Sequence, residues 1–136
     1  MLIVADASIA VAWQFEDEAT AEIDAVLRDV AIGGAIVPAL WHLEVANSLL
    51  SACRRKRMSL AARSLALDEL MRLPVTIDLE TDKHAWSATL DLADRHGLTV
   101  YDAAYLELAQ RRRLPLATLD RQLRAAAEAA GVPTLP

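Results

Sequence analysis

The stretch IVADASIAVAW, residues Ile3 to Trp13, decides how the rest of the chain is interpreted. Its first residues form an apolar run that is typical of a buried strand, and Asp6 interrupts that run. A carboxylate in such a place is costly unless something compensates its charge. A short helix is predicted from Ser8, so Asp6 lies at the junction between a strand and a helix.

The same alternation of short strands and longer helices continues along the chain. The pattern predicts further strands at residues 35–37, 75–77 and 116–117, after the first at 2–5. Helices are expected at 18–32, 38–56, 59–74, 81–96, 99–113 and 119–130. In the 38–56 helix, an apolar stripe is expected through Leu40, Leu43, Asn47 and Leu50. Strands separated by helices indicate a largely parallel sheet that is covered by helices on both faces.

Composition limits the class of protein. The 136 residues, 54% of them hydrophobic, suit a single domain spanning residues 1–136. The one cysteine, Cys53, can form no internal disulfide, and no basic region precedes the first apolar run, so we expect a soluble, cytoplasmic protein. The formal net charge of -5 argues against a coat protein that binds nucleic acid without specificity.

Four acidic residues lie where such a fold would place a site. Asp6 and Asp120 follow predicted strands, Asp102 lies in the first turn of a helix, and Glu44 shares a helix face with Asn47. In open parallel sheets, ligands bind at the carboxyl ends of the strands. Carboxylates brought together there would hold protons or bind a cation, and Mg²⁺ is suited to such oxygen ligands.

Each of these acids also has an ordinary structural explanation. Asp6 fits a turn before a Ser8 cap, and Thr99 with Asp102 matches a helix capping box. Asp120 would favour the start of a helix through the macrodipole, and Glu44 fits a solvated helix face. No single one of these acids indicates a site, but the four acids together favour a shared pocket.

Four segments in this order carry a family resemblance: VADASIAVAW, PALWHLEVANSLL, LTVYDAAYLELA and LATLD. Together they resemble the PIN domain nucleases, and in particular the VapC toxins of VapBC type II toxin-antitoxin systems. The resemblance implies a PIN-like three-layer α/β/α fold with a short, mostly parallel central sheet flanked by helices. It also implies an acidic pocket that binds Mg²⁺ or Mn²⁺ and a metal-dependent endoribonuclease activity.

The resemblance assigns roles to particular residues. It implies that four acids form both the metal site and the catalytic set: Asp6 and Asp102 as the most direct metal ligands, with Glu44 and Asp120 beside them. One of the latter two would accept the proton of the attacking water. It places three small polar residues beside the pocket, where they orient carboxylates or waters: Ser8, Asn47 and Thr118. Its implied partners are RNA, a second copy of the chain, and a VapB-type antitoxin.

Two basic runs are candidates for contacts with RNA phosphates. Arg54 and Arg55 end the helix that carries Glu44, while Arg111 and Arg112 end the helix that carries Asp102. The alternative is that these cations offset the helix macrodipole and solvate the surface. The Ala- and Leu-rich segment 59–73 is a candidate partner surface.

Two other functions stay open. A phosphotransferase of the haloacid dehalogenase type also places an aspartate after its first strand, but it needs a second acid two positions later, where this chain has Ser8. A catalytically silent acidic α/β interaction module, a degenerate nuclease, would keep the same residues without turnover.

Overall fold

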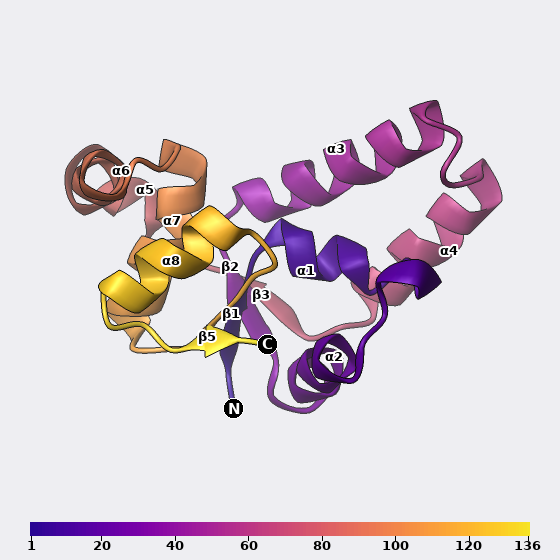
Figure 1. Cartoon of the computed structure of the whole chain (residues 1–136), viewed down its shortest axis with the longest axis horizontal. Helices are drawn as coiled ribbons and strands as arrows, with labels where there is room; N and C mark the ends of the chain where they lie inside the picture. Colours follow the sequence, from indigo (N-terminus) through magenta and orange to yellow (C-terminus); the bar gives the residue numbers. More distant parts are fainter.

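All 136 residues are described by a computed structural model of the chain, in which five short strands form one parallel sheet (Figure 1). The strands are β1 (Ile3–Ala5), β2 (Ala35–Val37), β3 (Val75–Ile77), β4 (Leu116–Ala117) and β5 (Thr134–Leu135). Their order in the sheet is β3-β2-β1-β4-β5, and every neighbouring pair is parallel. All carboxyl ends therefore lie at one edge of the sheet, and β1 is central.

Helical segments connect the strands. The bounds are α1 (Ala7–Ala12), α2 (Ala21–Gly33), α3 (Leu40–Arg54), α4 (Leu60–Met71), α5 (Thr81–His84), α6 (Leu90–His96), α7 (Val100–Arg112) and α8 (Arg121–Ala129). A short 3₁₀ turn, η1 (Glu16–Glu18), precedes α2, and a π-helical turn, η2 (Ala85–Thr89), joins α5 to α6. In Figure 1, α3 and α4 lie to one side of the sheet and α5 and α6 to the other. None of the helices combines the length and the apolar character needed to cross a bilayer.

The two faces of the sheet bury separate apolar clusters. Ile3 and Ala35 belong to a cluster with Val30 of α2, whereas Val4 belongs to a larger cluster with Leu106 of α7. This division follows the alternation of side chains along a strand. The layers are therefore helix, sheet and helix, which confirms the fold class expected from the sequence.

Two local predictions were wrong, and one strand was missed. Asp6, and not Ser8, is the N-cap of α1, because its side chain accepts from the Ile9 amide. Helix α2 begins after a Thr20 cap, while the acidic residues before it form η1. The pairing of β5 with β4 was not predicted.

The apolar stripe of α3 was also assigned to the wrong residues. Leu43 is 76% exposed, so the predicted stripe does not face the core. The buried face of α3 consists of Trp41, Val45, Leu49 and Ala52. These residues recur at intervals of four and three positions, as a core-facing helix stripe requires.

Candidate active site

A cavity of about 250 Å³ opens at the carboxyl edge of the sheet and gathers the predicted acids. Its walls come from the end of β1, from α1, from α3, from α7 and from the start of α8. The lining residues are Asp6, Ala7, Ser8, Glu44, Asn47, Ser48, Asp102, Tyr105 and Asp120. The structure therefore brings together all four predicted acids with Ser8 and Asn47.

Asp6 is held in one orientation by three donors. The hydroxyl of Ser8 donates to Asp6 Oδ1 at 2.6 Å, and the hydroxyl of Thr118 donates to Oδ2 at 2.5 Å. The Ile9 amide also donates to Oδ1, at 3.2 Å. Burial raises the pKa of Asp6 above its usual range, and these hydrogen bonds only partly offset it. Negative charge on Asp102 raises the pKa further.

Thr118 links the ends of β1 and β4 beneath the cavity. Besides donating to Asp6, its hydroxyl accepts from the Asp120 amide at 3.0 Å. Ser8 makes a parallel link, because its hydroxyl accepts from the Leu119 amide at 2.9 Å. Both residues therefore contact Asp6 and the chain next to Asp120.

Asp120 has two roles at once. Its Oδ1 accepts from the Leu123 amide at 2.8 Å and so caps α8, as the ordinary explanation predicted. The residue nevertheless lines the cavity, and its charge is the second largest cause of the raised pKa of Asp102, after burial. A capping role therefore does not exclude a place in the pocket.

Tyr105 is a pocket residue that the sequence reasoning missed. It is 1% exposed, and its hydroxyl donates to Glu44 Oε1 at 2.5 Å, which joins α7 to α3. Burial raises the pKa of Glu44, the Tyr105 hydroxyl counteracts part of that rise, and the charges of Asp102 and Asp6 add to it. Tyr105 lies three positions after Asp102, so its place on the same face of α7 was available from the spacing.

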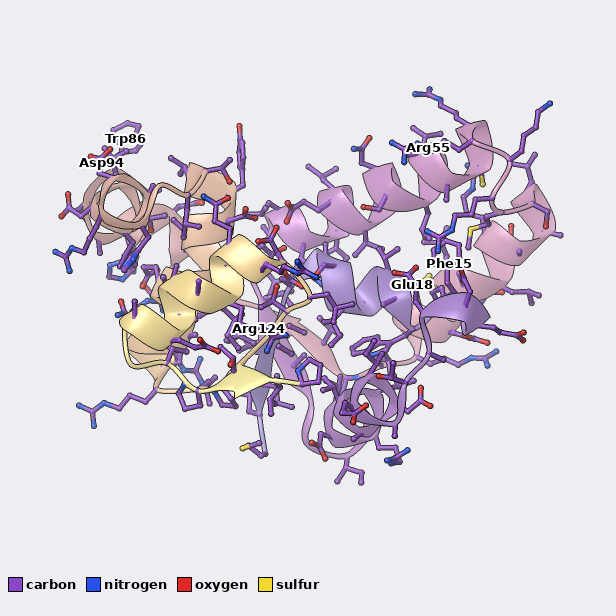
Figure 2. All side chains as sticks on the ribbon, in the orientation of Figure 1. Phe15, Glu18, Arg55, Trp86, Asp94 and Arg124 are labelled. Carbon is purple, nitrogen blue, oxygen red and sulfur yellow. The ribbon has the colours of Figure 1, made fainter.

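No cation balances the charge of the pocket. None of the four acids forms an ion pair with a lysine or an arginine. Arg124, labelled in Figure 2, donates instead to the main-chain oxygens of Thr118 and Pro136. The unpaired carboxylates form an all-oxygen donor set, which fits a hard divalent cation.

The spacing of these donors limits how such a cation could be held. No group of three or more Asp, Glu, His or Cys side chains in the chain is arranged to hold a metal ion directly. The pocket therefore suits an ion that takes one or two carboxylates and completes its shell with water, as Mg²⁺ commonly does.

The four arginines suggested for RNA contacts differ in their surroundings. Arg111 forms ion pairs with Asp78 at 2.7 Å and with Glu107 at 2.8 Å, so its guanidinium is already occupied. Arg54, Arg55 and Arg112 are exposed and form no ion pair. Arg111 is therefore not free to pair with an RNA phosphate.

The parallel sheet and the acidic cavity at its carboxyl edge place this chain among α/β proteins with a carboxylate-lined ligand site. Comparison with known proteins identifies the family. The model of the PIN domain family matches residues 3–129. The chain therefore belongs to the PIN domain family, as the sequence motifs indicated.

Individual relatives agree with this assignment. The chain is 39% identical to Ribonuclease VapC3 of Pyrobaculum aerophilum over 80 residues, which are 59% of this chain and 61% of that protein's length. The crystal structure of PAE2754 from the same organism superposes with a TM-score of 0.70 at 28% identity, over 98% of this chain and 92% of that one. FitAcB from Neisseria gonorrhoeae shares the fold, with a TM-score of 0.64 at 15% identity over 100% and 97% of the two chains.

Proposed function

We propose that this protein is a divalent-metal-dependent endoribonuclease that acts as the toxin of a toxin-antitoxin pair. The observation that carries the proposal is the convergence of four carboxylates, none paired with a cation, on one cavity. The similarity to a protein named Ribonuclease VapC3 supports RNA as the substrate.

Asp6 and Asp102 are the residues that would hold the metal. When bound, a divalent cation polarises a phosphate oxygen and lowers the pKa of water. Asp6 needs little reorganisation to bind it, because Ser8 and Thr118 already fix the carboxylate. Such preorganisation by neighbouring hydrogen bonds strengthens metal binding.

Glu44 is the better placed of the two remaining acids to accept a proton from the attacking water. Tyr105 occupies Oε1 of Glu44, which leaves Oε2 free. The raised pKa of Glu44 also makes it a stronger base than an ordinary carboxylate once it is ionised. Asp120, whose Oδ1 caps α8, retains a free Oδ2 and is the second candidate.

The residue two positions after Asp6 disfavours the phosphotransferase alternative. Ser8, at the position where a second acid would be needed, is engaged with Asp6 and with the Leu119 amide. Hydrolysis by water requires no nucleophile from the protein.

The decisive experiment compares Asp102→Asn with Asp94→Asn. Asp94 is an exposed aspartate on α6, remote from the cavity (Figure 2), so its variant is a matched control. With Mg²⁺ or Mn²⁺, we expect Asp102→Asn to cleave RNA at least about 10- to 100-fold more slowly than the control, the loss found when even a residue that supports a metal ligand is replaced, with an unchanged circular dichroism spectrum. Cleavage in excess EDTA, or undiminished cleavage by Asp102→Asn, would refute the metal mechanism. Absence of cleavage by the wild-type chain would favour the silent interaction module.

The toxin role has a separate test in cells. We propose a VapB-type antitoxin and a second copy of the chain as its protein partners. Induced expression of the chain is expected to arrest growth, and co-expression of the small open reading frame beside its gene is expected to relieve the arrest. Growth that is unaffected by an RNA-cleaving chain would separate the nuclease from the toxin role.

A further inference from the structure

A second cavity, of about 310 Å³, adjoins the acidic pocket. The two cavities share Asn47 and Ser48 as lining residues. Beyond these two, the second cavity is lined by Val11, Phe15, Ser51, Ala52, Arg55 and Arg57. It therefore leads away from the carboxylates toward the end of α3 that carries the arginines.

One face of α3 forms a wall of both cavities. Glu44, Asn47, Ser51 and Arg55 follow one another at intervals of three and four residues, which places them along the same side of the helix. The facing wall comes from α1, which packs against α3, and from the residues just after it. We call these two adjoining cavities together the α1–α3 groove.

Arg55 and Arg57, at the far end of the groove, differ in whether an acidic residue of the protein compensates their charge. Arg57 pairs with Asp17 at 3.3 Å and with Glu18 at 2.8 Å, and its guanidinium lies 3.9 Å from the centre of the Phe15 ring. Its charge is therefore compensated within the protein. Arg55 has no such partner, and Figure 2 shows it at the end of α3, apart from Glu18.

Arg55 is also too remote to compensate the pocket. It follows Glu44 by eleven residues on α3, a helical rise of about 16 Å. This exceeds the screening length of about 8 Å at physiological ionic strength. The groove thus presents a free cation at one end, carboxylates at the other, and the neutral polar groups of Asn47, Ser48 and Ser51 between them.

We propose that the α1–α3 groove binds the RNA strand on one side of the cleaved bond, and that Arg55 contacts a backbone phosphate a few nucleotides from it. This assignment rests on the proposed ribonuclease function. An RNA strand fits better than an acidic peptide, because a backbone with a charge at every nucleotide can meet Arg55 while its sugars meet hydroxyl and amide groups along the groove. Arg54, on the same helix but outside the groove, makes no such contact.

The experiment measures binding of a fluorescein-labelled, single-stranded oligoribonucleotide of mixed sequence in EDTA, so that binding is separated from cleavage. We expect Arg55→Ala to bind about three- to five-fold more weakly at low salt, the effect of losing one exposed ion pair. The slope of log K against log salt should become shallower by about 0.7, the value for one phosphate contact on a single strand. Arg54→Ala is the matched control and should retain the wild-type slope, as should Arg55→Lys.

A second measurement locates the phosphate. Neutral methylphosphonate linkages are placed one at a time along the oligoribonucleotide, and each oligonucleotide is bound to the wild type and to Arg55→Ala. One linkage, on one side of the cleavage site, should weaken binding by the wild type and leave binding by Arg55→Ala unchanged. Equal effects of Arg54→Ala and Arg55→Ala, or no linkage with this pattern, would overturn the groove assignment while leaving the ribonuclease proposal standing. No binding of RNA by the wild type in EDTA would also overturn the groove assignment, because the Arg55 contact needs no metal, whereas the ribonuclease proposal is judged separately by cleavage with Mg²⁺.

Discussion

Replacing Arg111 with methionine is expected to destabilise the protein by about 3–5 kcal/mol at neutral pH, the usual cost of removing one partner from a buried ion pair. The guanidinium contacts Glu107 through Nε at 2.8 Å and Nη2 at 3.1 Å. It contacts Asp78 through Nη2 at 2.7 Å and Nη1 at 3.3 Å. The side chains of Asp78 and Glu107 are only 3% and 4% exposed, so the variant would leave two buried carboxylates uncompensated.

The loss of stability in Arg111→Met should depend on pH in a defined direction. Burial alone would raise the pKa of Asp78, but hydrogen bonds from Arg111 and Thr81 outweigh it and hold the pKa below its usual range. The ionised carboxylate thus stabilises the fold above the unfolded-state pKa of about 3.9, and this contribution disappears as the pH falls through the lower folded-state value. The difference between wild type and variant is therefore expected to be largest near pH 7 and to shrink under acidic conditions.

Urea unfolding followed by tryptophan fluorescence measures this difference, because Trp41 is buried in the core. Arg112→Met is the matched control, since Arg112 is the exposed neighbour without an ion pair. If Arg111→Met is too unstable to study, Arg111→Lys, which keeps a point charge, should show a smaller loss in the same direction. A stability of Arg111→Met within about 0.5 kcal/mol of Arg112→Met at pH 7 would refute the reasoning.

Two further predictions concern the pocket. Burial raises the folded-state pKa of Asp6, so ionisation of Asp6 destabilises the folded protein as the pH rises past the ordinary pKa of an aspartate. In EDTA at pH 7, Asp6→Asn should therefore melt at a higher temperature than the wild type. It should also lack the rise in Tm that Mg²⁺ gives the wild type. A lower Tm, or a retained response to Mg²⁺, would argue against both the electrostatic cost and the metal role of Asp6. Tyr105→Phe removes only the hydroxyl that orients Glu44, and we expect RNA cleavage with Mn²⁺ to slow about ten-fold or more with the fold unchanged. Unaltered cleavage would mean that Tyr105 has no part in positioning Glu44.

The sequence predicted the four acids of the site better than the contacts that hold them. Strand and helix alternation places Asp6 and Asp120 at strand ends, and this part of the prediction depends only on local patterns. The hydroxyl of Tyr105 reaches Glu44 across 61 positions of the chain, a pairing that depends on how α3 and α7 pack. Periodicity within one helix does not determine such a contact.

The errors in the fold have similar causes. The leucines of α3 suggested a stripe through Leu43, whereas the folded chain buries Trp41 and Val45 in the larger apolar cluster. Strand β5 consists of two residues between prolines, too short for any periodic signal, and exists because it pairs with β4. Both features are determined by neighbours in space and not by local sequence.

The link between Asp6 and Thr118 joins residues separated by 112 positions, and it has a consequence for the synthesis of this protein. A ribosome makes β1 well before it makes the partner strand β4 and the Thr118 hydroxyl. Contacts between such distant segments form late, because a long loop must close first.

The carboxylate cluster therefore stays incomplete until Asp120 has been synthesised. Asp6 and Glu44 are made first, and Asp102 and Asp120 follow well after them. In the proposed ribonuclease, the pocket cannot assemble beside the messenger that encodes it before that point.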